Sequence, residues 1–212
     1  MIEAVIWDFG GVLTSSPFEA FARFETERGL PIDIIRRTNA ANHFENAWAK
    51  FERAEIDLDT FDKLFAEESR ALGAEVRGRD VLPLLSGTLR PEMVNALRTI
   101  KQNHKTGCIT NNLPANAIGS SSGRTLYVAE VMAQFDHVIE SAKIGLRKPD
   151  PKIYQMMIEA LGVDPKACVY LDDLGVNLKP AREMGMATIK VVSAEQAIAE
   201  LEDATGLNLR GA

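Results

Sequence analysis

The stretch "VIWDFGGVLT", residues 5–14, carries the first indication of the fold. It begins as a short apolar run of the kind found in buried parallel strands, and then carries Asp8, Gly10 and Gly11. A tight turn after a strand would explain the two glycines. A carboxylate at a strand tip, beside glycines that let backbone amides approach an anion, also indicates a nucleophile. The rest of the chain has to decide between these interpretations.

Five short apolar segments predict five buried parallel strands. The segments are residues 3–7, 105–110, 136–141, 167–171 and 187–192. Patterns of helical period separate most of them, such as Met93, Leu97 and Ile100 on one helix face. Strands that alternate with helices imply right-handed crossovers, so we expect an α/β fold with a doubly wound parallel sheet. Ligands of such sheets bind beyond the carboxyl ends of the strands.

Residues 15–88 interrupt this alternation, because they contain helix signals and no convincing strand. A segment of this length is large enough to form its own small core. We therefore expect a helical domain at 15–88, inserted after the first strand of a core built from 1–14 and 89–212.

Three helices are predicted inside this insert. The segment "SPFE" at 16–19 has the pattern of a capping box with proline at the first helical position, and Gly29 should end that helix. Asp59 is expected to cap another helix that ends before Gly73. Between them, an amphipathic helix is predicted from the spacing of Phe44, Ala47, Trp48 and Phe51.

The composition is ordinary for a globular protein: the 212 residues are 46% hydrophobic and 25% charged, with a net charge of −6. The sequence has no basic cluster of the kind that binds nucleic acid, and its apolar runs are too short to cross a membrane. The N-terminus has no secretion-signal pattern, and Cys108 and Cys168 look like reduced core residues, so we expect a cytoplasmic protein. "GSSSG" at 119–123 is expected to be a flexible loop. The oligomeric state stays open.

Polar side chains follow four of the five predicted strands. Because the carboxyl ends of parallel strands meet at one edge of a sheet, we expect these side chains to lie close together. In chain order they are Asp8, Thr110, Asn111, Asn112, Lys148 on a proline-bounded loop, Asp172, Asp173 and, a turn further on, Asn177.

This set of groups suits phosphoryl transfer. Three carboxylates brought together repel one another, and a hard divalent cation such as Mg²⁺ resolves that conflict with oxygen ligands. Lys148 offsets further negative charge, while Thr110 and Asn111 offer polar groups to a phosphate. Asp8 would be the nucleophile and would form an aspartyl-phosphate that water later hydrolyses. Each motif alone is more often a turn, a cap or a solvated residue; the ordered set favours the enzyme.

The ordered set resembles the haloacid dehalogenase superfamily, whose members are mostly magnesium-dependent phosphatases. The similarity covers nearly the whole chain. The chain most resembles the phosphatase domain of soluble epoxide hydrolases and related D-x-G-G-V-L proteins that are fused to acyl-CoA dehydrogenases. The similarity rests on "DFGGVLT" at 8–14, on "IESAKIGLRKPDPKIY" at 139–154, on "VYLDDLGVNLKPAREMGMATIKV" at 169–191 and on the tail at 197–209.

The resemblance implies a Rossmann-like core, a helical cap at 15–88 and a small phosphorylated substrate. It also implies a role for each matching residue. Asp8 would be nucleophile and magnesium ligand, Asp173 and the Gly10 carbonyl further metal ligands, Thr110 and Asn111 phosphate binders, Lys148 the charge-balancing lysine, and Asp172 and Asn177 supporting residues, Asp172 through a metal-bound water.

Two positions depart from the family's pattern. Phosphatases of this family normally carry a second aspartate, the general acid and base, two residues after the nucleophile, where this chain has Gly10. Four residues after the nucleophile, where the family often has threonine, this chain has Val12. Valine at that position is also familiar among the epoxide-hydrolase-like members. Loss of a positioned acid typically costs roughly 10²–10⁴ in rate. Gly10 is either a missing acid in a competent site or a glycine required for a positive φ or for space.

Three functions stay open. The first is a magnesium-dependent phosphatase. The second is a 2-haloacid dehalogenase, which also uses an aspartate nucleophile without a second aspartate but has little use for the acidic pair Asp172 and Asp173. The third is a catalytically weak protein that binds a phosphate ligand or a partner. A binder would saturate with ligand and release no phosphate, which separates it from the first.

Overall fold

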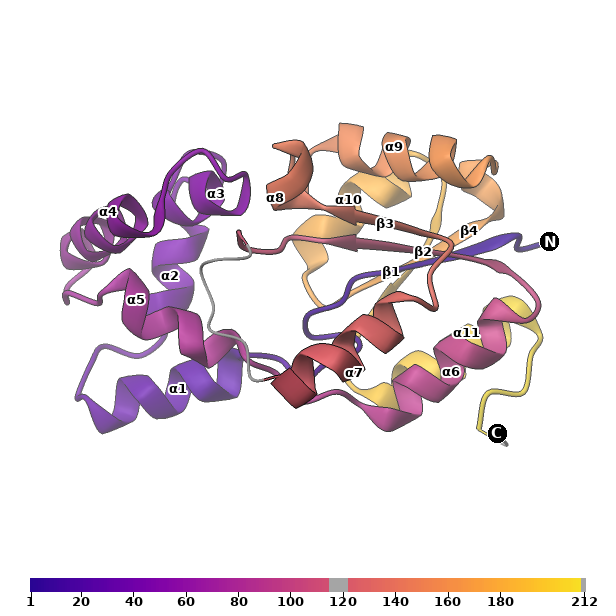
Figure 1. Cartoon of the computed structure of the whole chain (residues 1–212), viewed down its shortest axis with the longest axis horizontal. Helices are drawn as coiled ribbons and strands as arrows, with labels where there is room; N and C mark the ends of the chain where they lie inside the picture. The colour runs from indigo at the N-terminus through magenta and orange to yellow at the C-terminus, as the bar shows by residue number, and fades with distance from the viewer. Residues whose placement is uncertain (115–121, 211–212) are drawn as a thin grey trace.

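The computed structural model describes residues 1–114 and 122–210 (Figure 1). The five predicted strands are all present and form one parallel sheet in the order β3-β2-β1-β4-β5. Their bounds are β1 Ala4–Trp7, β2 Lys105–Thr110, β3 His137–Glu140, β4 Cys168–Asp172 and β5 Ala187–Lys190. The prediction of a doubly wound α/β sheet is confirmed.

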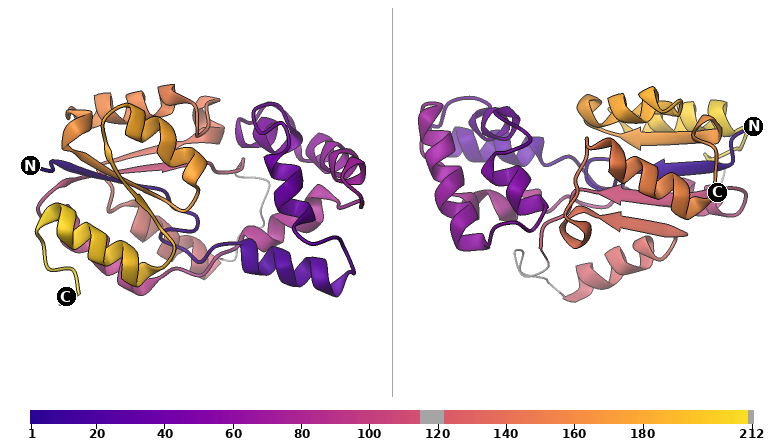
Figure 2. Two further views of the ribbon diagram at one scale, coloured as in Figure 1. Left: turned by 180° about the vertical axis from the view of Figure 1, so that it is seen from behind. Right: turned by 90° about the horizontal axis from the view of Figure 1, so that it is seen from above.

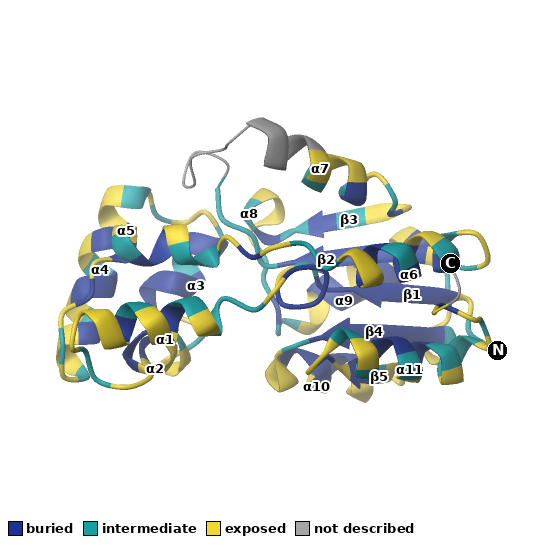
Figure 3. Ribbon diagram, turned by 90° about the horizontal axis from the view of Figure 1, so that it is seen from below, coloured by how far each residue is buried: buried dark blue, intermediate teal, exposed yellow. Residues whose placement is uncertain are grey.

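Helices cover both faces of the sheet (Figure 1). Alternate side chains of β1 pack on opposite faces of the sheet. Val5 and Trp7 belong to one apolar cluster, and Ala4 and Ile6 belong to the other. The first side carries α6 Pro91–Lys101, α7 Ser122–Met132 and α11 Ala194–Thr205. The second carries α8 Ser141–Ile144, α9 Pro151–Leu161, η2 Pro165–Ala167 and α10 Gly175–Glu183. Figure 3 shows the central strands almost wholly buried between these layers.

The register of the sheet brings the first and fourth strand tips together. Trp7 is paired with Cys108 on one side and Leu171 on the other. The ladder continues one step further, because the Asp8 N–H donates to the Leu171 carbonyl at 2.8 Å. Asp8 therefore leaves the sheet beside Asp172, the residue after Leu171.

The helical insert, residues 15–88, has an apolar core of its own. Phe51 and Phe61 stack with ring centroids 4.4 Å apart, and Phe65 packs beside them. The helices lie beyond the carboxyl ends of the strands (Figures 1 and 2). They are α1 Phe18–Glu27, α2 Ile34–Ala40, α3 Ala47–Glu52, α4 Leu58–Ala71, α5 Gly78–Val81 and η1 Leu82–Leu85. We propose that this insert is a cap domain with the predicted boundaries.

The two connections between insert and sheet run side by side. Thr14 and Leu89 form an antiparallel bridge. Next to it the Ser15 N–H donates to the Thr88 carbonyl at 2.7 Å, and the Thr88 N–H donates to the Ser15 hydroxyl at 2.9 Å. A side chain at Gly87 would meet the Ser15 carbonyl at 2.5 Å, so the close approach of the two segments requires glycine there. The junction is a narrow paired neck.

Two helix starts in the insert differ from the prediction. The capping box at 16–19 is not formed: α1 begins at Phe18, and the Ser16 hydroxyl accepts only the Phe18 N–H, at 3.5 Å. The cap of α4 is Asp57, whose carboxylate accepts an N–H of the first turn at 2.8 Å, and Asp59 lies inside that turn. The backbone is extended at Asp57, as a capping residue requires.

The helix around Trp48 is shorter than predicted. It begins at Ala47, and Phe44 lies in the preceding loop with 54% of its surface exposed. Asn46 sets this boundary, because its side chain accepts the Ala49 N–H at 2.8 Å and donates to the Ala41 carbonyl at 2.8 Å. One side chain thus caps α3 and holds the loop before it in a non-helical path.

Three other expectations have plain outcomes. The predicted loop at 119–123 overlaps α7, which includes Ser122 and Gly123, while 119–121 lie outside the described residues. Cys108 and Cys168 are buried free thiols. Among the described helices, none has both the length and the apolar character needed to cross a membrane.

Candidate active site

Asp8 lies directly beyond β1, at the sheet edge that faces the insert, and is 8% exposed. Its Oδ1 accepts the Phe9 N–H at 2.6 Å and lies 2.9 Å from the Lys148 Nζ. Burial raises the pKa of Asp8 well above its usual range, Lys148 lowers it, and the Asp172 charge raises it again. The ionised form of this carboxylate therefore depends on cations beside it.

Lys148 joins the first and fourth strand tips. Its Nζ lies 2.9 Å from the Asp8 carboxylate and 2.7 Å from that of Asp172, and only 1% of its side chain is exposed. Burial by itself lowers the pKa of Lys148, but Asp172 and Asp8 raise it above its ordinary value. The lysine is a fixed, buried positive charge between two carboxylates.

The Asn111 side chain holds the backbone that carries this lysine. Its amide group donates to the Lys148 carbonyl at 3.1 Å, and its oxygen accepts the Lys148 N–H at 2.9 Å. Thr110, the last residue of β2, is buried at the same edge. That Thr110 and Asn111 bind phosphate stays a prediction. For Asn111 it concerns the backbone N–H, since the side chain is engaged with the loop.

Asp172 is fully buried and is held by four donors. Its Oδ2 accepts the Lys148 ammonium at 2.7 Å and the Tyr170 hydroxyl at 2.6 Å. Its Oδ1 accepts the Leu174 N–H at 2.8 Å, and the Asn177 amide donates at 3.1 Å. A carboxylate with these contacts orients its neighbours. The supporting role of Asp172 and Asn177, for Asp172 through a metal-bound water, stays a prediction.

Two tyrosines belong to this network and were missed in the sequence. Tyr170 donates to Asp172, and Tyr154 donates to the Asn177 carbonyl at 2.7 Å. Their rings meet edge to face with centroids 5.4 Å apart. The sequence could have indicated Tyr170, because it precedes Asp172 by two residues on β4 and such residues share a face of the sheet. No sequence pattern indicated Tyr154 on α9, because only tertiary packing brings it to the network around Asp172.

The two adjacent glycines have different surroundings. Gly11 has φ +74°, and a Cβ there would lie within 2.5 Å of the Asp173 Cγ. Gly10 is exposed, is not among the glycines with positive φ, and a Cβ there would meet nothing within 4 Å. Positive φ and close approach of protein atoms therefore belong to Gly11, and the alternative that Gly10 needs a positive φ is wrong. That Gly10 makes room for the substrate stays a prediction.

Three carboxylates converge at this edge. Ligand oxygens of Asp8, Asp172 and Asp173 all lie within 4.8 Å of one another. Burial and then the Asp172 charge raise the pKa of Asp173 to about 6. With all three carboxylates ionised, the Lys148 ammonium balances only one of their negative charges. A divalent cation with oxygen ligands balances the remaining charge, so the residues present fit Mg²⁺.

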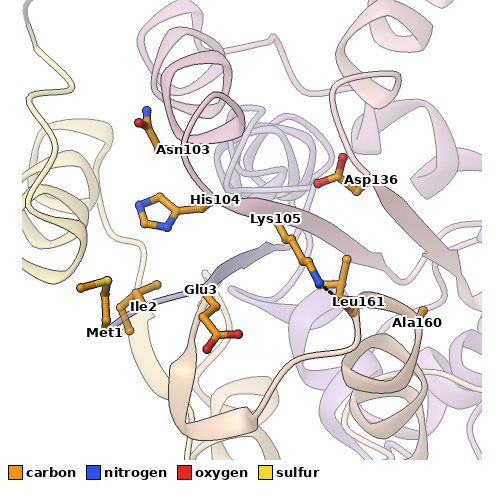
Figure 4. Close-up of a pocket in the computed structure, with 9 residues that line it drawn as sticks. All are labelled: Met1, Ile2, Glu3, Asn103, His104, Lys105, Asp136, Ala160 and Leu161. Atoms are coloured by element: carbon orange, nitrogen blue, oxygen red, sulfur yellow. Dashed lines mark hydrogen bonds between the residues drawn. The ribbon is translucent and has the colours of Figure 1, made fainter.

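A surface groove of about 790 Å³ lies at the other end of the sheet (Figure 4). Glu3 precedes β1 there, Lys105 begins β2, and the Lys105 Nζ donates to the Leu161 carbonyl at 2.6 Å. These residues stand at the amino ends of the strands. The groove is therefore separate from the carboxylate cluster.

Known proteins are similar to this chain in sequence. Over 97% of this chain, the bifunctional epoxide hydrolase 2 of Rattus norvegicus is 40% identical, although the match spans only 39% of that protein. The phosphatase MT3486 of Mycobacterium tuberculosis is 30% identical over 87% of this chain and 85% of its own length.

A solved structure has the same fold. It is a Bacteroides thetaiotaomicron enzyme of the haloacid dehalogenase family, in complex with magnesium and inorganic phosphate. It aligns with 95% of this chain and 99% of its own at a TM-score of 0.62 and 18% identity. The family model of the haloacid dehalogenase-like hydrolases matches residues 2–185. This chain therefore belongs to the haloacid dehalogenase-like hydrolases.

Proposed function

We propose that this hydrolase is a magnesium-dependent phosphatase that acts on a small phosphorylated molecule and forms an aspartyl-phosphate on Asp8. The observation that carries the proposal is the site formed by Asp8, Lys148, Asp172 and Asp173 at the carboxyl edge of the sheet. Three carboxylates around one ammonium keep a net negative charge, which a divalent cation would balance so that an anionic phosphoryl group can approach.

The chain's own groups suit the first chemical step. The Asp8 carboxylate attacks phosphorus, the bond from phosphorus to the leaving oxygen breaks, and its electron pair departs with that oxygen. Lys148 stays charged at 2.9 Å from Asp8 and offsets the negative charge that collects there. Asp172, held by four donors, keeps the lysine in place.

In the second step, water attacks the phosphorus of the aspartyl-phosphate. The bond between phosphorus and the Asp8 oxygen breaks, the carboxylate is restored, and both water protons leave on the phosphate product. Magnesium held by Asp8, Asp173 and the Gly10 carbonyl would supply charge neutralisation at the phosphoryl oxygens. Gly11 serves this arrangement, because a side chain there would overlap the Asp173 carboxylate.

Gly10 limits the substrates that this site serves well. A second aspartate at that position would protonate the leaving oxygen, and glycine carries no such group. We therefore propose a preference for leaving groups that depart as stable anions, such as phenolates or carboxylates. Alkyl phosphates should react slowly in the natural protein.

The relatives support the phosphatase over the dehalogenase. Several relatives by sequence are named phosphatases. Solved structures of the same fold do not separate the two functions, because one holds magnesium with inorganic phosphate and another is an L-2-haloacid dehalogenase. The clustered carboxylates of Asp8, Asp172 and Asp173 also favour a metal-dependent reaction. A dehalogenase has little use for that charge.

Phosphate release tests the proposal. The purified protein is assayed on a panel of phosphorylated metabolites and aryl phosphates, with Mg²⁺ and then with a chelator, and chloride release from 2-chloropropionate is measured in parallel. We expect phosphate release that needs Mg²⁺. Chloride release that survives the chelator would establish the dehalogenase. Saturable phosphate binding without turnover on any substrate would establish the binder, which Gly10 favours.

A further inference from the structure

We propose that Arg147 is a positioning residue that couples the helical insert to the loop carrying Lys148, so that docking of the insert sets the geometry of the nucleophile site. This inference rests on the proposed function in one respect, the charge-balancing role of Lys148. The coupling itself rests on contacts between the insert and the core.

Arg147 reaches from the core into the insert at two points. Its Nε donates to the Glu52 carboxylate at 2.7 Å, and its NH1 donates to the His43 carbonyl at 2.6 Å. Glu52 ends α3, and His43 lies in the loop before that helix. Among the residues whose side chains the structure describes, 1–114 and 127–210, this is the ion pair that joins the insert to the core. The other ion pairs there stay within one part or the other.

Glu52 is anchored in the insert's interior. Its second oxygen accepts the Trp48 indole N–H at 2.8 Å, and the Trp48 ring packs edge-on against Phe61, 5.6 Å between centroids. Only 6% of Glu52 is exposed. Burial raises the pKa of its carboxyl group, and Arg147 works against that shift. A buried carboxylate of this kind is costly to leave unpaired, so the pair favours the docked insert.

On the core side, the next residue is Lys148. Its backbone is held by Asn111 and its Nζ by Asp8 and Asp172. A continuous chain of contacts thus runs from the apolar core of the insert, through Glu52 and Arg147, to the nucleophile. Movement of the insert would pull on the loop that fixes the lysine, whereas a docked insert holds it.

The insert offers a matched control in Arg53. This arginine also pairs with a glutamate through its Nε at 2.7 Å, and it also donates to the carbonyl of a neighbouring loop residue, Phe44, at 2.8 Å. Its side chain is 14% exposed, against 16% for Arg147. Both partners of Arg53, Glu55 and Phe44, lie within the insert. The two arginines differ in whether the contact crosses to the core, and also in their partners, because the Glu55 side chain is 47% exposed and that of Glu52 is 8% exposed.

The test compares Arg147→Gln, Glu52→Gln, their double variant, Arg147→Lys and the control Arg53→Gln. Kinetics use p-nitrophenyl phosphate, and calorimetry in excess Mg²⁺ measures the affinity for inorganic phosphate, which needs no turnover. We expect Arg147→Gln and Glu52→Gln each to lower kcat/KM and phosphate affinity roughly tenfold, the double variant to add little, and Arg147→Lys to recover part. Arg53→Gln should stay within about twofold of wild type in both, although its melting temperature falls.

Equal losses in Arg53→Gln and Arg147→Gln, or a fully additive double variant, would overturn the coupling. So would phosphate affinity and kcat/KM that stay at wild-type values in Arg147→Gln. If wild type releases neither p-nitrophenol nor phosphate from the panel of metabolites, the proposed phosphatase fails instead. The calorimetric comparison then still decides whether Arg147 couples insert and site.

Discussion

At the carboxyl edge of the sheet the charged groups are buried and hold one another, with Lys148 between Asp8 and Asp172. In the helical insert the interior is aromatic, and most ion pairs lie on the surface, as Arg28 with Asp80 does. Surface pairs of that kind contribute little to stability, whereas a buried group that loses its partner is costly. Loss of a charged partner at the sheet edge should therefore cost more stability than loss of a surface pair in the insert.

This contrast assigns different tasks to the two regions. The sheet edge assembles oxygen ligands, a fixed cation and a nucleophile, which are the parts of a reaction. The insert lies beyond that edge and reaches it through Arg147, so it bears on access and geometry. Four experiments can break or sharpen the division.

The largest effect is expected from Asp8→Asn. The amide cannot form an acyl-phosphate intermediate, so phosphate release should fall on the order of 10⁴-fold or more. Circular dichroism should show an unchanged fold, because the side chains have the same shape. Substantial activity would sink the covalent mechanism once mass spectrometry has excluded deamidation back to aspartate.

Gly10→Asp should raise activity. A carboxyl group at this exposed position finds open space and can protonate a leaving oxygen, so alkyl phosphates should react up to roughly 10²–10⁴ times faster. Aryl phosphates, whose phenolate leaves unaided, should gain only a few-fold. The measurement is kcat/KM across a series of leaving groups. A folded, magnesium-binding Gly10→Asp protein that hydrolyses alkyl phosphates no faster than wild type would reject the missing-acid account.

Gly11→Ala should weaken magnesium binding, with Gly10→Ala as its matched control. A methyl group at Gly11 overlaps the Asp173 carboxylate and strains a left-handed backbone, at roughly 1–2 kcal/mol. We expect at least about a tenfold loss of Mg²⁺ affinity by calorimetry, since a displaced ligand group lowers metal affinity by such factors. Gly10→Ala should bind as wild type does. Similar losses in both variants would mean that Asp173 does not depend on the space at Gly11.

The smallest effect is the stabilisation by magnesium itself. At ten times its dissociation constant, Mg²⁺ should add about 1.4 kcal/mol and raise the melting temperature by roughly 3–5 °C, and a chelator should reverse this. Hydrogen exchange should slow at the ends of β1 and β4 more than in α4 of the insert. Equal protection of the strand ends and of α4 would show that Mg²⁺ stabilises the sheet edge and the insert together.

The sequence by itself determined the sheet and the location of its polar edge. Strand patterns are local, and in a parallel sheet the chain direction already decides which ends share an edge, so the residue order alone placed Asp8, Lys148 and Asp172 together. The family's residue pattern added expected roles for these positions. The starts of α1, α3 and α4 were predicted less well, because capping depends on a backbone angle at one residue, as at Asn46 and Asp57.

The partners that surround each group are known only from the folded chain. Tyr154 reaches Asn177 from another helix, and Arg147 meets Glu52 from 95 residues away, so no local pattern could pair them. The two glycines after the nucleophile look equivalent in sequence. They differ because the Asp173 carboxylate packs against Gly11 and nothing packs against Gly10. Local preference selects strands and helices, whereas the identity of a neighbour across space is fixed by packing alone.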